Sequence, residues 1–149
     1  MNGNSFTQLQ DFGIMVDIST PYYITDRFGT HIYILNDNFD FLSMKTFSMS
    51  NYMVTINSSI YLTGTFNIWK TDNYLNILIT LSDSNAFYNG IYFNCTENLI
   101  YVAPTGYTYF QVFDLNLTLN HTVRLLTNNN NYNPRSFSAY NNELYVGTF

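Results

Sequence analysis

Short runs of alternating apolar and polar residues follow one another along the chain, separated by clusters of Asn, Asp, Ser and Gly. A period of two predicts β-strands, and no segment has the 3.6-residue periodicity of an amphipathic helix. Four of the runs share one motif, in which a Tyr in second place is followed by Ile, Leu or Val. These runs are residues 22–25, 60–63, 100–103 and 144–147. The chain therefore reads as an all-β protein with an internal repeat.

The Tyr of the motif recurs at Tyr23, Tyr61, Tyr101 and Tyr145, with spacings of 38, 40 and 44 residues. One strand is expected ahead of each motif and two are expected after it. The strands ahead are 13–17, 53–57, 90–94 and 136–140; those after are 32–37, 68–72 and 110–114, then 41–47, 75–81 and 119–126. Each repeat therefore contains four short strands, joined by residues that suit tight hairpins.

Four antiparallel strands in about 40 residues form the blade of a β-propeller. We expect a single partial propeller over residues 1–149, with about three and a half four-stranded antiparallel blades. The expected parts are blades 12–50, 51–88 and 89–134, a half blade 135–149, and a candidate closing strand in 1–11. A β-sandwich also has strands every 8–12 residues. The same strand types in the same order favour the propeller.

The strand motifs resemble those of the NHL and YVTN-type propeller repeats. The resemblance rests on the segments GIMVD (13–17), YITD (23–26) and FQVFD (110–114), and it extends loosely over nearly the whole chain. It implies that the GIMVD-like strand is the innermost of each blade and that the strand at 42–47 is an outermost one.

Composition narrows the range of partners. Aromatic residues make up 19% of the chain and charged residues only 10%, which allows a buried core and argues against disorder. The net charge is −5 and the five Lys and Arg residues are scattered, so we expect no nucleic-acid partner. No apolar run reaches the 18 residues of a membrane span, and the first residues lack the features of a signal peptide.

We expect no catalytic residue, metal or cofactor, because His31, His121 and Cys95 are the only residues of their types and have no zinc-ligand spacing. Cys95 is expected to be a buried small residue or a free thiol. A ring of strand-ending carboxylates could in principle bind calcium, but an Asp at a strand end usually fixes the following turn. The carboxylates in question are Asp17, Asp37, Asp72 and Asp114.

Four sequons are candidate glycosylation sites, at Asn57, Asn94, Asn116 and Asn120. Their number is what the composition gives by chance, but they fall near expected turns, which accept a sugar. With the sparse charge and single cysteine, they favour an extracellular or cell-surface protein. A cytoplasmic protein is the alternative.

The leading hypothesis is a non-enzymatic propeller module for recognition or self-assembly, with a protein or glycan as partner. Three and a half blades do not close a ring. The chain could be a stretch of a longer protein, or open blade edges could join copies into a homo-oligomer or a polymer. The candidate assembly residues are Leu144, Tyr145, Val146 and Phe149. The alternatives are a hydrolase or lyase with its site at the central channel, and an intracellular scaffold.

Overall fold

The computed structural model describes residues 21–25, 30–48, 50–127, 130–131, 133–140 and 143–148. Strands dominate these residues, and no helix occurs within them. The strands are β1 (Tyr22–Thr25), β2 (His31–Leu35), β3 (Phe41–Thr46), β4 (Ser50–Ile56), β5 (Ser59–Asp72), β6 (Ile77–Asn94), β7 (Leu99–Pro104), β8 (Tyr109–Phe113), β9 (Leu119–Arg124), β10 (Leu126–Thr127), β11 (Asn130–Asn131), β12 (Pro134–Tyr140) and β13 (Glu143–Thr148).

All neighbouring strands pair antiparallel, in the orders β1-β2-β3, β4-β5-β6-β7-β8-β9, β10-β11 and β12-β13. The six-stranded sheet contains two long strands, β5 and β6, where the sequence predicted four separate ones. They are continuous because the segments that link their halves pair with each other, with Thr65 opposite Phe87. Each long strand therefore supplies two successive strands of the repeat.

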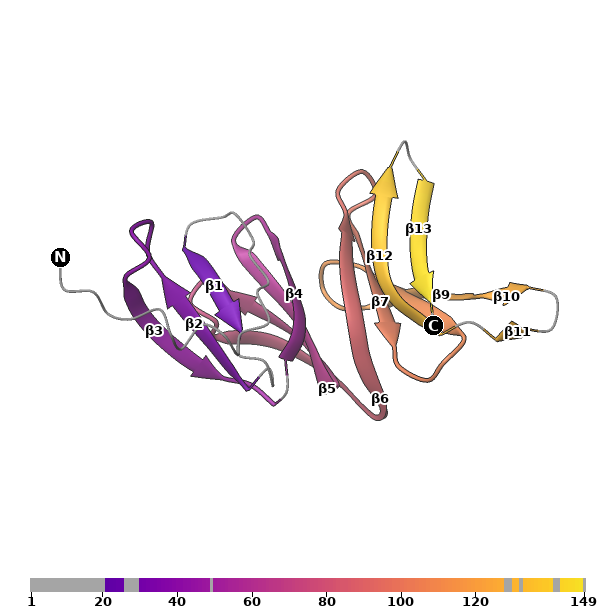
Figure 1. The fold of residues 1–149 in the computed structure, drawn as a ribbon, viewed down its shortest axis with the longest axis horizontal. Coiled ribbons are helices and arrows are strands. Elements are labelled where there is room, and N and C mark those ends of the chain that lie inside the picture. Colours follow the sequence, from indigo (N-terminus) through magenta and orange to yellow (C-terminus); the bar gives the residue numbers. More distant parts are fainter. Residues whose placement is uncertain are drawn as a thin grey trace.

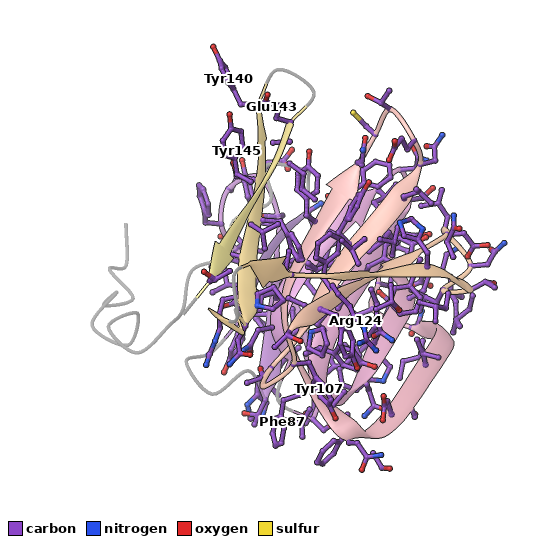
Figure 2. All side chains as sticks on the ribbon, turned by 90° about the vertical axis from the view of Figure 1, so that its right-hand side faces the viewer. Phe87, Tyr107, Arg124, Tyr140, Glu143 and Tyr145 are labelled. Atoms are coloured by element: carbon purple, nitrogen blue, oxygen red, sulfur yellow. The ribbon has the colours of Figure 1, made fainter. Side chains whose placement is uncertain are left out.

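The strands form a row of antiparallel units, which we call blades (Figure 1). The first blade contains β1, β2 and β3, and its expected inner strand at 13–17 lies outside the described residues, as do residues 1–11. The second blade contains β4, both halves of β5 and the first half of β6; the third contains the second half of β6, then β7, β8 and β9. The half blade, β12 and β13, ends the row and faces the viewer in Figure 2.

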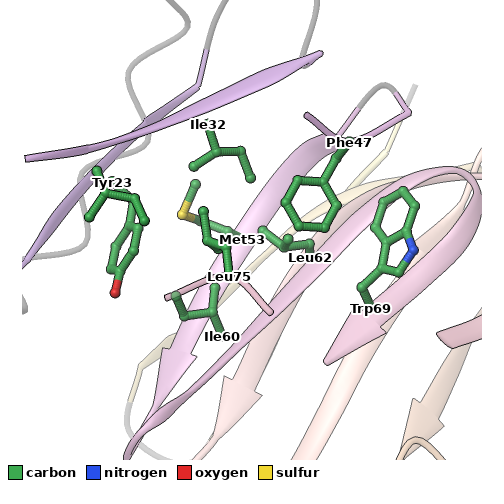
Figure 3. Close-up of a cluster of buried hydrophobic side chains, with 9 residues drawn as sticks. Tyr23, Ile32, Phe47, Met53, Ile60, Leu62, Trp69 and Leu75 are labelled. Atoms are coloured by element: carbon green, nitrogen blue, oxygen red, sulfur yellow. The ribbon is translucent and has the colours of Figure 1, made fainter. Parts of the chain in front are cut away.

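Alternate residues of each motif strand pack against opposite neighbours. Ile60 and Leu62 are buried with the first blade, whereas Tyr61 between them is buried with the third. The first of these cores is shown in Figure 3. It contains Tyr23, Ile32, Ile34, Phe47, Met53, Ile60, Leu62, Trp69 and Leu75. Because a strand alternates its side chains, one motif serves both faces of a blade.

The contact between the third blade and the half blade is aromatic. Phe137 of β12 packs edge-on against Phe110, with ring centroids 5.4 Å apart, and lies 6.4 Å from Tyr101. Nearby, β6 and β12 approach closely at Gly90, where φ is +58° and an added Cβ would collide with the carbonyl of Arg135. Only glycine meets both conditions without strain.

Candidate binding surface

The same five-residue turn follows the third strand of the first, second and third blades. Its first residue is Asn36, Asp72 or Asp114, and the Oδ1 of that residue accepts hydrogen bonds from the backbone N–H groups two and four positions later, at 2.8–2.9 Å. The hydrogen bond from the Asn76 side chain contributes most to holding the pKa of Asp72 below its usual value. The side chain of the first residue thus fixes the turn.

Some of the carboxylates that were expected to fix turns do so, and one does not. Asp72 and Asp114 fix turns, as predicted, but in the first blade Asn36 does so instead of Asp37. The prediction for Asp37 is wrong because β2 ends at Leu35, two residues before it. Asp17 lies outside the described residues.

The fourth residue of each turn is apolar and has a left-handed backbone, with φ of 62° at Phe39, 60° at Leu75 and 59° at Leu117. Leu75 and Leu117 are buried in the cores that their blades share with the preceding blade. Phe39, in the first blade, is 58% exposed. A left-handed conformation is unfavourable for such residues, so packing in these cores offsets that cost for the two leucines.

The recurring Tyr links each blade to the turn of the next. The Tyr23 hydroxyl donates to the carbonyl of Asn73 at 2.7 Å, and the Tyr61 hydroxyl donates to the carbonyl of Leu115 at 2.8 Å. Each acceptor directly follows the residue that fixes its turn, so the two contacts are equivalent. The Lys70 ammonium also donates to Leu115, at 2.8 Å. Burial raises the pKa of Tyr61 to about 12, so the hydroxyl stays a donor at neutral pH.

Tyr101 holds the same place in the third blade but has a different partner. Its hydroxyl donates to Oε2 of Glu97, 2.7 Å away in the turn between β6 and β7. Burial, followed by the bond to Glu97, raises the pKa of Tyr101. Tyr23 is buried in the core between the first and second blades and Tyr61 in the core between the second and third, whereas Tyr101 is only partly buried.

A hollow of about 430 Å³ lies over Tyr101, between the third blade and the half blade. It is lined by Tyr92, Asn94, Cys95, Thr96, Glu97, Tyr101, Ala139, Tyr140, Glu143 and Leu144. Two carboxylates and three tyrosines line it, and no Lys or Arg does. It is therefore a polar, acidic recess with aromatic walls.

Strand β13 forms one border of this hollow and of the described molecule. It pairs with β12 on one side, and no other described strand pairs with its second edge. Tyr140 and Tyr145, 68% and 50% exposed, project near Glu143 at the tip of the hairpin (Figure 2). Three assembly candidates, Leu144, Tyr145 and Val146, lie on this strand; the fourth, Phe149, lies outside the described residues.

The histidines and the cysteine lie apart from one another. His31 begins β2 and is hydrogen-bonded to Thr30, while His121 is exposed on β9. Cys95 is a free, exposed thiol in the hollow, so the expectation of a buried residue is wrong and that of a free thiol is confirmed. Within the described ranges, no three His, Cys, Asp or Glu side chains gather in a way that could hold a metal ion.

The sequon asparagines differ in accessibility. Asn57 and Asn116 are exposed in turns, and Asn120 is exposed on β9. Asn94 is partly buried and organises its own turn: its Oδ1 accepts from the N–H of Thr96 at 3.0 Å, and its Nδ2 donates to Glu97 at 3.0 Å. A sugar on Asn94 would compete with these bonds.

No protein-family model matches the chain, and a search of curated proteins finds no match. Solved structures do resemble it. Dihydro-heme d1 dehydrogenase NirN, in complex with DHE, is 12% identical with a TM-score of 0.60, over 69% of this chain and 25% of that one. The Pan2 WD40 domain of Neurospora crassa is 12% identical with a TM-score of 0.55, over 72% of this chain and 34% of that one. Both are β-propellers.

The chain is a partial β-propeller. The predicted fold class is thereby confirmed, while nothing in these matches assigns the NHL repeat. At 12% identity the likeness concerns the fold alone, and the chain spans only a minor part of either neighbour's length. Among the described residues there is no helix long and apolar enough to cross a membrane.

Sequence reasoning found the recurring Tyr but missed what it binds. It also missed Asn36 as the residue that fixes a turn, and Glu97 as the partner of Tyr101. The repeat itself held a signal. Aligning residues 36–40, 72–76 and 114–118 reveals the five-residue turn, whose first residue follows the recurring Tyr by 13, 11 and 13 positions.

Proposed function

We propose that this chain is a non-enzymatic propeller module that binds another polypeptide, a second copy included, through the open edge of β13. The observation that carries the proposal is the edge itself. Among the described strands β13 pairs only with β12, so its second edge has no partner there. Tyr145 on this strand is half-exposed. The unpaired backbone of an edge strand is a template for a strand from another chain.

The composition of β13 supports this role. Protected edge strands carry Lys or Pro, or are covered by other elements. The sequence of β13, ELYVGT, has neither residue, and its single charge, Glu143, lies at its first position. Exposed Tyr residues, here Tyr140 and Tyr145, offer apolar area together with a hydrogen-bonding tip, which suits protein surfaces.

An extracellular or cell-surface location is part of the proposal. It is supported by the exposure of Asn57, Asn116 and Asn120, since a surface asparagine can carry a glycan without disturbing the core. Intact-mass measurement of the protein secreted from a eukaryotic host tests it. Mass increments of glycans would agree with the proposal, and an unmodified mass would count against it.

Sedimentation velocity over a concentration series tests the assembly form of the proposal with purified protein alone. Tyr145→Lys places a charge on the open edge without altering a buried position. Tyr74→Lys is the control, because Tyr74 is also an exposed tyrosine, 67% exposed, in a turn of the second blade.

We expect the native chain and Tyr74→Lys to associate as concentration rises, and Tyr145→Lys to remain a single chain. Amide hydrogens of residues 143–148 should become protected from exchange on association. A native chain that stays monomeric at every concentration, with unprotected β13 amides, would refute assembly through this edge.

A further inference from the structure

Two aromatic side chains close the contact between the outer parts of the first and second blades. Phe47 directly follows β3 of the first blade, and Trp69 lies on the third strand of the second blade, within β5. Their rings pack edge-on with centroids 5.3 Å apart, and each residue is 5% exposed (Figure 3). This contact is therefore filled by a pair of buried rings.

The repeat identifies the equivalent pair between the second and third blades. Phe47 comes 11 positions after the first residue of the first-blade turn, and Trp69 comes three positions before that of the second-blade turn. The same offsets from the next turns lead to Asp83 and Gln111. The strand pairing of the three outer hairpins has the same register: His31 with Thr46, Asn67 with Ser82, and Tyr109 with Arg124. A carboxylate and an amide thus replace the two rings.

A groove of about 330 Å³ lies at this second contact. Asp83 and Gln111 line it together with residues of β6, β8 and β9, all from the two blades whose four strands are described. Asp and Gln side chains are smaller than Phe and Trp, so they do not fill the space that the rings fill in the first contact. The volume falls in the range of about 300–1,000 Å³ that is usual for ligand pockets.

Four polar side chains line this inter-blade groove: Ser82, Asp83, Ser84 and Gln111. Oδ1 of Asp83 accepts from the N–H of Asn85 at 3.0 Å. The Gln111 amide has no hydrogen-bond partner among the described residues. A carboxylate accepts hydrogen bonds, whereas amides and hydroxyls both donate and accept. The groove therefore suits a ligand with several hydroxyl groups.

The rest of the lining is apolar. It consists of Leu81, Phe113 and Leu119 and the ring of Tyr88. Burial, followed by the negative charge of Asp83, raises the pKa of Tyr88, so the carboxylate lies close to this apolar wall. No Lys or Arg lines the groove, so an anionic ligand would have no counter-charge there.

We propose that the inter-blade groove binds a neutral sugar residue of a glycan. A sugar ring resembles in size the aromatic rings that occupy the equivalent space of the first contact. Its C–H groups contact the apolar wall, while its hydroxyls bind Asp83 on one blade and Gln111 on the other, the usual combination of apolar lining and a few polar groups. This activity is separate from the β13 edge and does not rest on the proposed function.

Saturation-transfer NMR titrations of the full chain test the proposal with four probes, the methyl glycosides of glucose, galactose, mannose and N-acetylglucosamine. We expect saturable binding of at least one. Asp83→Asn keeps the size of the side chain and should weaken that affinity about tenfold, because a neutral amide oxygen accepts hydrogen bonds less strongly than a carboxylate. Asp37→Asn is the control, because Asp37 is exposed outside the groove, and it should leave the affinity unchanged.

The double variant Asp83→Phe/Gln111→Trp restores the aromatic pair of the first contact. It should fill the groove and abolish glycoside binding, while its free energy of unfolding in urea stays equal to that of the native chain or rises. Should this variant not fold, Asp83→Asn still decides the question.

Binding of none of the four glycosides, undiminished affinity in Asp83→Asn, or binding by the folded double variant would overturn the proposal. If n-butylamine binds in the groove and the glycosides do not, Asp83 recognises a cation and the sugar assignment is wrong. None of these results depends on self-association, so the β13 edge is confirmed or refuted independently.

Discussion

Replacing Tyr61 with Phe tests the blade-to-blade contact that the recurring Tyr makes. The change removes one oxygen and leaves the ring, which is 1% exposed and packed in the core of the second and third blades. The lost interaction is the 2.8 Å hydrogen bond to the carbonyl of Leu115. That carbonyl keeps a second donor, the ammonium of Lys70, also at 2.8 Å.

The expected loss of stability follows from the hydrogen bonds that each variant removes. A buried hydrogen bond contributes about 1 kcal/mol net, so Tyr61→Phe should lower the free energy of unfolding by roughly that amount. Lys70→Met should cost a similar amount, since Tyr61 still donates. With both donors gone the partly buried carbonyl is unpaired, which adds a desolvation cost of about 1–3 kcal/mol. The double variant should therefore lose about 3–5 kcal/mol, more than the sum of the two single losses.

Urea unfolding followed by fluorescence and by circular dichroism measures these values. The chain has one Trp, and Trp69 is buried against Phe47, with ring centroids 5.3 Å apart, so its emission reports on the core. Tyr74→Phe is the control, because its ring is exposed and the change should have little effect. Strictly additive losses in the double variant, or no loss in Tyr61→Phe, would refute the reasoning that the Tyr hydroxyl links the blades.

Three further predictions use the same measurement. Burial raises the pKa of Tyr61 to about 12 in the folded chain, so between pH 10 and 12 unfolding releases its proton and the free energy of unfolding should fall as pH rises; the fall should be less steep in Tyr61→Phe. Leu75→Asn should cost about 3 kcal/mol and Phe39→Asn about 1 kcal/mol or less, since Asn accepts the left-handed backbone at both places and only Leu75 is buried. Gly90→Ala should cost more than Gly106→Ala, because both have positive φ but only Gly90 has a backbone carbonyl in the space of the new methyl group; equal costs would contradict the close approach of β6 and β12.

The repeat could be predicted from the sequence because the features that mark it are local. Alternation of apolar residues marks each strand, and Tyr23, Tyr61 and Tyr101 mark one position of the blade. Turn-forming residues mark the hairpins, with Asp72 and Asp114 fixing turns as expected. Each of these signals depends on a few neighbouring residues, so it can be read without knowing the tertiary structure.

Other features depend on pairing between distant residues and could not be predicted in this way. The continuity of β5 and β6 requires Thr65 to pair with Phe87, 22 residues away. The partner of the Tyr hydroxyl lies in the next blade, 50 residues from Tyr23, where local periodicity has no influence.

In a stacked repeat each unit is stabilised by its own strands and by its contact with the next unit. Two of the Tyr side chains, Tyr23 and Tyr61, are buried by such contacts, and this burial raises the pKa of Tyr61 to about 12. The ring of Tyr101 lies against the rings of Phe110 and Phe137, but its hydroxyl borders the acidic hollow. The face of the third blade that carries Tyr101 is thus built like the faces that carry Tyr23 and Tyr61. It differs in what lies against it. Within the chain, the equivalent faces at Tyr23 and Tyr61 are covered by the five-residue turn of the following blade, which accepts the hydrogen bond of the Tyr hydroxyl.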